Sequence, residues 1–420
     1  MAYIEVDGTN ELFGEITIQG SKNAVLPLLA ASVLVKGEVQ IRHCPHISDI
    51  QAMLDILKKA GSIVTWEKNT LILNTKWLQP FSISQEEAVK TRTSILFLGA
   101  LLGRFGEARL CYPGGCLIGK RPIDLHCMIM QQLHSQLISD SDCIYAVGKP
   151  VGATLVLPFP SVGATENAIL ASVLAKGTTK ICGGAKEPEI IALCNFLNKA
   201  GAKIKQEKST GIWIIEGVDD LHSMQYDLPA DRIVAGTYLT AVASVSGEVV
   251  VKGVEATDLA GFLPVLEQTG VQLKTGKEFV WIKAKAPIHA VKTIITAPFP
   301  AFPTDMQSQM MALLTRADGV SVIEETIFEG RFLIAEELRK MGALLEITRQ
   351  KATIFGVKKL TGAIVCAKDL RGGAALVIAG LSAEGRTQIK GYHYIARGYE
   401  DICRDFTMLG AKMKLVTERD

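Results

Sequence analysis

One segment of the chain combines a thiol with flexible backbone and positive charge. Residues 112–122 read Tyr-Pro-Gly-Gly-Cys-Leu-Ile-Gly-Lys-Arg-Pro, so that Cys116 lies among three glycines. Lys120 and Arg121 follow closely and favour a thiolate at Cys116, while the glycines let the backbone approach a ligand or act as a hinge. A structural cysteine, as expected for Cys194 in its apolar run, has no such surroundings. The pattern favours a functional cysteine on a loop that can move.

The composition narrows the chemistry open to this thiol. Nine cysteines without any C-x-x-C pair argue against a zinc ribbon and against a disulfide framework, so we expect reduced thiols. His43, Cys44 and His46 stand close together, but no second ligand pair follows at metal-binding spacing. We therefore expect no metal site.

Charge and hydropathy exclude broad classes of partner. The 45 Lys and Arg residues nearly balance 43 Asp and Glu residues, and a net charge of +2 gives no general attraction to nucleic acid or anionic membranes. Mean hydropathy is +0.24, yet apolar stretches such as residues 24–35 are shorter than the roughly 18 residues of a membrane span. The first residues lack the basic and apolar regions of a signal peptide, so we expect a cytoplasmic protein.

Regularly spaced glycines divide the chain into repeated units. Five pairs of glycines, 23 to 25 residues apart, enclose a β-rich stretch and an amphipathic run: Gly37 and Gly61, Gly177 and Gly201, Gly247 and Gly270, Gly319 and Gly342, and Gly385 and Gly410. A sixth copy begins at Arg92 and reaches no closing glycine, because the segment around Cys116 is inserted in it. Six copies predict an α/β fold of two three-repeat domains, residues 21–227 with the Cys116 loop, and residues 1–20 plus 228–420.

One position recurs where the first helix of each copy should begin. We count back 14 or 15 residues from the first glycine of each pair, and from the corresponding glycine of the sixth copy. The residues at this position are Lys22, Arg92, Val162, Arg232, Asp305 and Arg371. The second helix of a copy is expected to begin at Asp49, Glu189, Leu259, Arg331 or Arg397. Helix N-termini expose N–H groups and a positive dipole end, which suit phosphate or carboxylate. Cations repeated at this place predict a site for a small, multiply anionic substrate.

Two copies differ from the cationic pattern. Asp305 is the only carboxylate at a first-helix position; among cations it should be ionised and able to take a proton from a substrate hydroxyl, although an acid that merely caps its helix has the same pattern. Ser161, Val162 and Gly163 offer a hydroxyl and bare amides that suit a diphosphate. That signal is weak by itself, because Ser-x-Gly before a helix is common capping chemistry.

At these residues the chain resembles the UDP-N-acetylglucosamine enolpyruvyl transferases over essentially its whole length. The matching stretches are Gly20 to Ala24, Pro113 to His126, Ser161 to Asn167, Lys186 to Glu189, Phe302 to Gln307, Glu325 to Glu329 with Arg331, Asp369 to Arg371, and Arg397 to Tyr399. The most specific is Gly-Gly-Cys-x-Ile-Gly-x-Arg-Pro around Cys116. The resemblance implies an inside-out α/β barrel of two three-unit domains that close over a cleft.

The same resemblance implies a reaction and a biological role. The 3-hydroxyl of UDP-N-acetylglucosamine would add to C2 of phosphoenolpyruvate, and phosphate would leave through a tetrahedral intermediate. This is the first committed step of bacterial peptidoglycan synthesis. It implies small-molecule substrates and no metal or organic cofactor.

Individual residues receive roles by the same resemblance. Cys116 would be the general acid toward C3 of phosphoenolpyruvate and the thiol that fosfomycin alkylates, and Asp305 would be the base. Phosphoenolpyruvate would be held by Lys22, Asn23, Arg121, Arg331, Arg371 and Arg397, with Lys22, Arg121 and Arg397 on the phosphate. The sugar nucleotide would be contacted by Asn23, Arg92, Arg121, Pro122, Ile123, Asp124, Leu125, Ser161, Val162, Gly163, Asp305 and Ile327.

Four positions depart from the family pattern. Ala396 replaces a usual Asp before Arg397, Gly330 and Ile334 replace a usual Asn and His around Arg331, and Val234 stands where an acid is common. These changes keep open a weakly active or inactive paralogue that binds a UDP-sugar in a regulatory role.

Two enzymatic alternatives also follow from the residues. The sister reaction on the same fold transfers the enolpyruvyl group to shikimate 3-phosphate, and the Gly-Gly-Cys loop speaks against it. A hydrolase with a Cys116 and His126 dyad is the other, but the sequence contains no oxyanion motif to support it.

Overall fold

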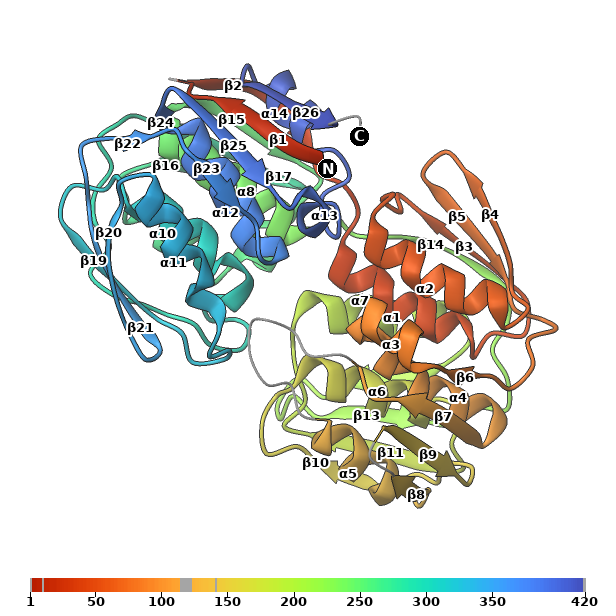
Figure 1. Cartoon of the computed structure of the whole chain (residues 1–420). Coiled ribbons are helices and arrows are strands. Elements are labelled where there is room, and N and C mark those ends of the chain that lie inside the picture. The colour runs from red at the N-terminus through yellow and green to blue at the C-terminus, as the bar shows by residue number, and fades with distance from the viewer. Residues whose placement is uncertain (1, 10, 114–122, 140–141, 418–420) are drawn as a thin grey trace. The chain divides into compact units, whose positions relative to one another are not determined.

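The computed structural model describes residues 2–9, 11–113, 123–139 and 142–417, which fall into two compact units (Figure 1). One unit, here the Lys22 unit, contains the described residues between 20 and 229. The other, the Asp305 unit, contains residues 2–9, 11–19 and 230–417. Each unit has its own hydrophobic core, so each is described by itself.

The six predicted copies are confirmed as six four-stranded sheets of one design. In each sheet an edge strand runs parallel to its neighbour, and the two remaining strands continue the sheet antiparallel. In each copy a buried helix precedes the inner strand of the parallel pair, and an outer helix follows that strand. In four copies the buried helix lies between the two parallel strands in the chain, as the crossover of a parallel pair requires, whereas residues 224–227 and 12–17 join their sheets from elsewhere in the chain.

The Lys22 unit contains three of these sheets. Their strand orders are β14 (Met224–Asp227), β3 (Glu38–Arg42), β5 (Thr70–Asn74), β4 (Ile63–Glu67); β6 (Ser82–Ile83), β7 (Glu107–Cys111), β9 (Cys143–Val147), β8 (Gln136–Ser139); and β10 (Thr154–Val156), β11 (Thr178–Cys182), β13 (Trp213–Glu216), β12 (Lys203–Gln206). The inner helices are α1 (Lys22–Ser32), α4 (Phe97–Phe105), which continues the 3₁₀ turn η1 (Arg92–Leu96), and α6 (Val162–Ser172). The outer helices are α2 (Ser48–Lys59), α5 (Asp124–Gln132) and α7 (Pro188–Lys199), and α3 (Gln85–Lys90) precedes η1.

The Asp305 unit repeats the arrangement. Its sheets are β2 (Leu12–Thr17), β15 (Gly247–Lys252), β17 (Phe279–Ala284), β16 (Gln272–Gly276); β18 (Ile294–Ile295), β19 (Val320–Glu324), β21 (Lys351–Phe355), β20 (Leu344–Thr348); and β23 (Ile364–Cys366), β25 (Arg386–Lys390), β1 (Ala2–Asp7), β26 (Lys412–Thr417), with a small pair β22 (Leu360–Thr361) and β24 (Ala383–Glu384). The inner helices are α8 (Arg232–Val245), α10 (Gln307–Leu314) and α12 (Leu370–Leu381). The remaining helices are η2 (Ala256–Leu259), α9 (Leu263–Glu267), η3 (Thr304–Met306), η4 (Arg331–Leu333), α11 (Ile334–Lys340), α13 (Tyr392–Ile395) and α14 (Ile402–Met408).

The inner helices are buried on all sides. Every residue of α8 and α12 is buried, and in α1 only Asn23 reaches the intermediate class. A helix that is apolar all round belongs in a core, and here the sheets lie outside it. The expected inside-out arrangement is confirmed, and across the described residues the three sheets of a unit remain separate and do not join into one barrel of strands.

The glycine that closes most copies has a specific conformational task. Gly61, after α2, has a φ of +97°, in the left-handed region that stops a helix and favours glycine. In the irregular copy, α5 ends at Gln132 and His134 takes this role with a φ of +66°. The prediction that this copy reaches no closing glycine is confirmed.

The N-terminal strand completes the last sheet. β1 lies between β25 and β26 and pairs antiparallel with both, so that Ala2 stands opposite Thr417. Figure 1 shows β1, in red, among the blue strands of the chain's end. It occupies the place that β5 holds in the first sheet. In the last copy of the repeat, this strand is therefore supplied by the N-terminal segment of the chain.

One pair of cysteines contradicts the sequence expectation of reduced thiols throughout. Cys111 ends β7 and Cys143 begins β9, and these residues stand opposite each other in the antiparallel register. They form a disulfide, with the two Cα atoms 3.8 Å apart. Their 32-residue separation carries no recognisable pattern, because only the register of the two strands brings them together.

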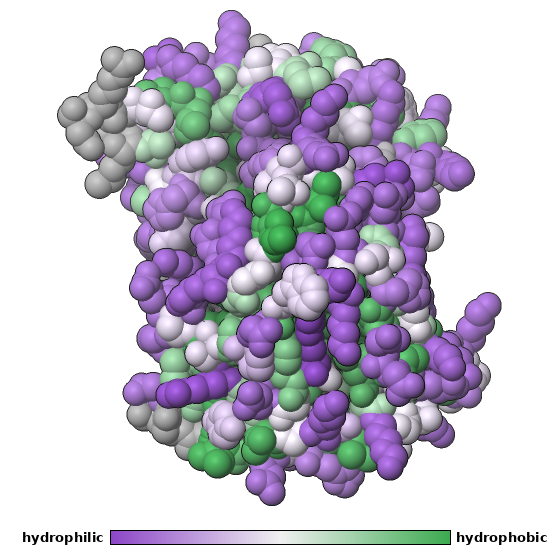
Figure 2. All heavy atoms as spheres, turned by 90° about the vertical axis from the view of Figure 1, so that its right-hand side faces the viewer, coloured by the Kyte–Doolittle hydropathy of each residue, from purple (hydrophilic) through white to green (hydrophobic). Residues whose placement is uncertain are grey.

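The surface is mainly hydrophilic. On the face drawn in Figure 2, hydrophilic side chains predominate and hydrophobic residues appear singly or in small groups. Single exposed apolar side chains such as Trp77 and Ile63 are ordinary on folded proteins. Over the described part of the chain, no helix combines the length and the apolar character that crossing a membrane requires.

Candidate active site

A carboxylate clamped by two arginines is the central feature of the Asp305 unit. Asp305 lies in η3, directly before α10. Its Oδ2 pairs with Nη2 of Arg371 at 2.9 Å, and its Oδ1 pairs with Nη2 of Arg331. Both arginine side chains are only 4% exposed, whereas that of Asp305 is 24% exposed. The carboxylate is therefore the accessible member of the cluster.

The charge of Arg371 is secured by its surroundings. Burial by itself would lower the pKa of this guanidinium, but Asp305, Tyr399 and Asp231 outweigh burial and raise the pKa above its ordinary value. Asp369 caps α12 by accepting from the backbone N–H of Arg371 at 3.0 Å. The cap fixes the backbone from which the arginine reaches Asp305.

Two buried donors beside Asp305 have no hydrogen-bond partner among the described residues. They are Nε of Arg331 and Nη1 of Arg371. The guanidinium of Arg331 also lies 5.3 Å from the centre of the Phe328 ring. Buried donors are normally satisfied, so each of these two nitrogens could still donate to an acceptor while the ion pairs to Asp305 stay formed.

The Lys22 unit contains a second buried ion pair. Lys22 is the first residue of α1, as predicted, and Ser21 caps this helix by accepting from the N–H of Ala24. The ammonium group lies 2.9 Å from Oδ2 of Asp49 in the first turn of α2, with side-chain exposures of 11% and 6%. The sequence placed Asp49 only as a helix start, and nothing in its type or spacing identified Lys22 as its partner.

A neutral histidine lies beside the start of α6. The amide nitrogen of Asn167 lies 2.8 Å from Nδ1 of His126, and the amide oxygen accepts from the N–H of Gly99. Burial lowers the pKa of His126 to about 4; the charge of Arg92 acts in the same direction and Asp124 opposes it. The imidazole is neutral at pH 7, and the donation from Asn167 leaves its proton on Nε2.

The expected diphosphate segment meets this histidine. Ser161 caps α6 by accepting from the N–H of Ala164, and Val162 and Gly163 are the first residues of the helix. A Cβ placed on Gly163 would lie 3.4 Å from Cε1 of His126, so this backbone approaches the ring closely. The segment is partly exposed, and its amide groups point out of a helix start as anion sites require.

Other residues predicted for the site have mixed outcomes. Arg92 begins η1, and Asn23 belongs to the first turn of α1. Ile123 directly precedes α5, Asp124 and Leu125 are its first residues, and Ile327 lies between β19 and η4.

The prediction that Arg397 begins a helix is wrong, because α13 ends at Ile395 and α14 begins only at Ile402. Arg397 is half-buried in the intervening turn. Cys116, Arg121 and Pro122 lie outside the described residues.

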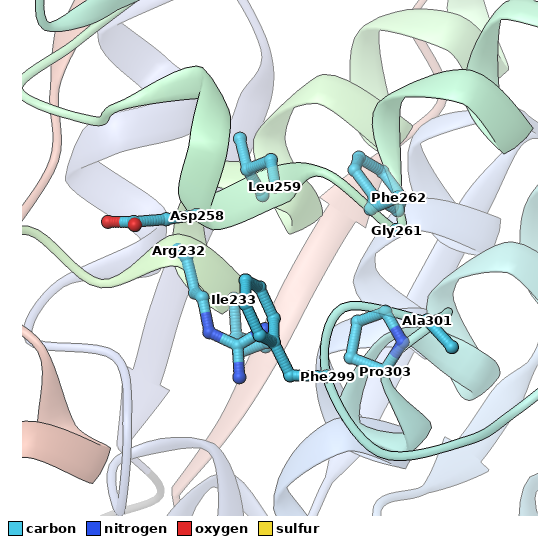
Figure 3. A pocket seen from close by; sticks show the side chains of 9 residues that line it. All are labelled: Arg232, Ile233, Asp258, Leu259, Gly261, Phe262, Phe299, Ala301 and Pro303. Atoms are coloured by element: carbon cyan, nitrogen blue, oxygen red, sulfur yellow. The ribbon is translucent and has the colours of Figure 1, made fainter. Parts of the chain in front are cut away.

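Arg232 begins α8 as predicted and lines a small pocket. The other lining residues are Ile233, Asp258, Leu259, Gly261, Phe262, Phe299, Ala301 and Pro303 (Figure 3). The guanidinium carbon of Arg232 lies 5.7 Å from the centre of the Phe299 ring. This cation–π contact holds the side chain at the first turn of the helix.

The departures from the family pattern lie around these groups. Val234 is fully buried in α8, where its N–H donates to the capping carboxylate of Asp231. Gly330 precedes Arg331, Ile334 begins α11 in a buried position, and Ala396 follows α13. The ion pairs of Arg331 and Arg371 with Asp305 are formed with these substitutions in place.

Comparison with known proteins connects this geometry to a family. Residues 6–406 match the family model described as EPSP synthase (3-phosphoshikimate 1-carboxyvinyltransferase). Proteins named UDP-N-acetylglucosamine 1-carboxyvinyltransferase are similar over nearly the full length of both chains. That of Caldanaerobacter subterraneus is 42% identical over 412 residues (98% of this chain, 99% of the relative), and that of Campylobacter lari is 41% identical over 419 residues (100% of each). Another, from Carboxydothermus hydrogenoformans, is 43% identical over 410 residues, 97% of each chain.

Solved structures support the same fold. The enolpyruvyl transferase NikO from Streptomyces tendae matches with a TM-score of 0.89 at 23% identity, covering 100% of this chain and 99% of its own. EPSP synthase from Acinetobacter baumannii matches with a TM-score of 0.76 at 16% identity, covering 100% of each. At such identities the likeness shows the fold alone. The family model and the relatives above show that this chain belongs to the carboxyvinyl (enolpyruvyl) transferase family, among the UDP-N-acetylglucosamine 1-carboxyvinyltransferases.

Proposed function

We propose that this chain transfers the enolpyruvyl group of phosphoenolpyruvate to the 3-hydroxyl of UDP-N-acetylglucosamine and releases phosphate. This is the first committed step of peptidoglycan synthesis, and we place it in the cytoplasm. The observation that carries the proposal is the roughly 40% identity to enzymes of this name along the whole chain. The buried cations of each unit suit anionic groups such as the carboxylate and the phosphate of this substrate.

In this proposal Asp305 is the base for the sugar hydroxyl. Its carboxylate is the exposed member of its cluster, and two guanidinium groups favour its ionised form. Arg331 and Arg371 would receive the substrate carboxylate through two donors that have no hydrogen-bond partner among the described residues, and Arg397 would join them. Binding in this way would leave Asp305 fixed at the moment of proton transfer.

The leaving phosphate and the nucleotide are proposed to engage the other predicted residues. Lys22, held by Asp49, would bind the phosphate with Arg121 and Arg397, and Cys116 would protonate C3. The diphosphate of the acceptor would rest on the segment from Ser161 to Gly163. Asn23, Arg92 and Ile327 would contact the sugar, and Pro122, Ile123, Asp124 and Leu125 the uridine.

Preorganised cations stabilise the charge that the addition and elimination steps develop on carboxylate and phosphate. The proposed chemistry therefore includes no metal or organic cofactor. We further propose that residues 21–227 and residues 1–20 plus 228–420 act as the two domains of the transferase.

The test is phosphate release from phosphoenolpyruvate with three acceptors: UDP-N-acetylglucosamine, shikimate 3-phosphate and none. We expect release only with the first. Shikimate 3-phosphate is included because the family model carries the name of that activity. Tight binding of UDP-N-acetylglucosamine without phosphate release would instead support a regulatory paralogue.

A further inference from the structure

A fully buried glutamate ties together two loops of the Asp305 unit. Glu325 follows β19 and is 0% exposed. Its Oε2 accepts from the hydroxyl of Thr304 at 2.9 Å, and its Oε1 accepts from the backbone N–H groups of Ile327 at 2.9 Å and Phe328 at 3.1 Å. Its own N–H donates to the carbonyl of Gln350 at 2.8 Å. The carboxylate thus spans from η3 to the loop before η4.

Each partner of this carboxylate adjoins a group of the proposed site. Thr304 is the neighbour of Asp305 in η3. Ile327 is one of the three residues proposed to contact the sugar. Phe328 presents the ring on which the guanidinium of Arg331 lies. One side chain therefore joins the backbone that carries the proposed base to the backbone that carries a proposed acceptor contact.

We propose that Glu325 is a positioning residue for the transfer, which sets the place of Asp305 relative to the bound acceptor. A carboxylate suits this task because it is an acceptor at both oxygens and can take two amides and a hydroxyl at once. The ion pairs with Arg331 and Arg371 hold the end of the Asp305 side chain, and Glu325 holds the side chain of Thr304, the residue directly before Asp305. This inference rests on the proposed transfer reaction.

Three variants separate positioning from other roles. In Glu325→Leu no acceptor remains for the two amides and the hydroxyl. In Glu325→Gln the amide oxygen still accepts from the loop, and the amide nitrogen donates to a Thr304 hydroxyl that turns to accept. Thr304→Val removes the link to Asp305 alone. Thr326→Val is the matched control in the same loop, because Thr326 donates to the carbonyl of Thr296 and does not contact the carboxylate of Glu325.

Misplacement of a reacting group by a fraction of an ångström to 1 Å costs on the order of 10- to 100-fold in rate. We expect Glu325→Leu to lower kcat by that amount and Thr304→Val by about tenfold or less, with the KM for phosphoenolpyruvate little changed. Glu325→Gln should recover most of the activity, and Thr326→Val should match the wild type. In Glu325→Leu and Thr304→Val together, the losses should be less than multiplicative, because both act through one contact.

The outcomes distinguish this inference from the proposed function. If the wild type releases phosphate with neither acceptor, the proposed function is refuted. The role of Glu325 is then tested by calorimetric binding of UDP-N-acetylglucosamine. We expect weaker binding in Glu325→Leu and wild-type binding in Thr326→Val. With an active wild type, unchanged kcat in Thr304→Val and Glu325→Leu overturns the inference. A Gln variant as slow as the Leu variant also overturns it, because the charge of Glu325 and not its placement of the loops would then matter. If Glu325→Leu does not fold, Thr304→Val and Glu325→Gln decide between these outcomes.

Discussion

The ion pairs of the two units occupy the same places in the repeat with opposite polarity. In the Lys22 unit, the cation Lys22 begins the inner helix and the acid Asp49 stands at the start of the outer helix of the same copy. In the Asp305 unit, the acid Asp305 precedes the inner helix and the cation Arg331 begins the outer one. In these two copies the starts of the inner and outer helices therefore lie close together, and either start can carry the acid or the cation.

The Asp305 unit adds a second cation to this arrangement. Arg371, from the next copy, contacts the other oxygen of Asp305. The Lys22 pair carries no net charge, whereas the Asp305 cluster carries an excess of +1 and exposes its carboxylate. The first is suited to orient an ammonium group, and the second to hold a reactive acid between fixed charges.

The sharpest way to test this difference is to neutralise the acid of the Asp305 cluster. Asp305→Asn should reduce kcat by a factor of about 10² to 10⁴, the range for loss of a general base. Phosphate release measures the effect, and calorimetry should show that UDP-N-acetylglucosamine still binds. A kcat within threefold of the wild type would remove Asp305 from the proposed role.

The two units should also respond differently to reductant. The Cys111–Cys143 bond lies in the Lys22 unit and closes a loop of 32-residue separation, for which chain entropy predicts a stabilisation of about 3.7 kcal/mol. Reduction should lower the melting temperature of this unit by roughly 7 to 15 °C in scanning calorimetry. Cys111→Ser is the control, since its melting temperature should be low already and insensitive to reductant. An unchanged wild type would show that the bond contributes no stability.

Acid should weaken the Lys22 unit through His126. The folded pKa of about 4 lies below the unfolded value of 6.5, so the unfolded chain takes up the proton first as the pH falls. Stability is complete above about pH 6.5 and falls by roughly 2 kcal/mol at pH 5, decreasing further until about pH 4. Urea unfolding at pH 7 and pH 5 measures the loss. In His126→Gln the difference between the two pH values should shrink by this amount, and a persistent difference would assign it to other groups.

The smallest effect is expected at the partner of Lys22. Asp49→Asn keeps an oxygen that can accept from the ammonium group but removes the charge, which corresponds to about 1 kcal/mol or a severalfold rise in the KM for phosphoenolpyruvate. Steady-state kinetics with both substrates varied should show this rise with little change in kcat. If kcat fell as far in Asp49→Asn as in Asp305→Asn, the two acids would be equally important for the reaction. The proposed difference between the two ion pairs would then be wrong.

The sequence predicted what depends on local pattern and missed what depends on tertiary partners. Lys22, Val162 and Arg232 are the first residues of their helices, as the glycine spacing indicated, because one repeat length sets the phase of every copy. Arg397 breaks this phase, since it lies in the turn between α13, which ends at Ile395, and α14, which begins at Ile402.

The pairs of the candidate site could not be predicted in the same way. Lys22 with Asp49, Asn167 with His126 and Thr304 with Glu325 all join segments that meet only after the sheets form. Glu325 stands within a stretch that matches the family, but its spacing to Thr304 has no local meaning. The disulfide between Cys111 and Cys143 was missed because it depends on the register of two strands.

The position of β1 has a consequence for the order of events during synthesis. The Lys22 unit has all its strands once β14 has emerged from the ribosome, so it can fold while the remaining chain is still being made. The last sheet of the Asp305 unit must wait, because β1 is translated well before β25 and β26, the two strands with which it pairs. Until then this first strand exposes unpaired edges. The adjacent ends also make the chain suitable for circular permutation, in which joining Ala2 to Thr417 would leave every sheet intact.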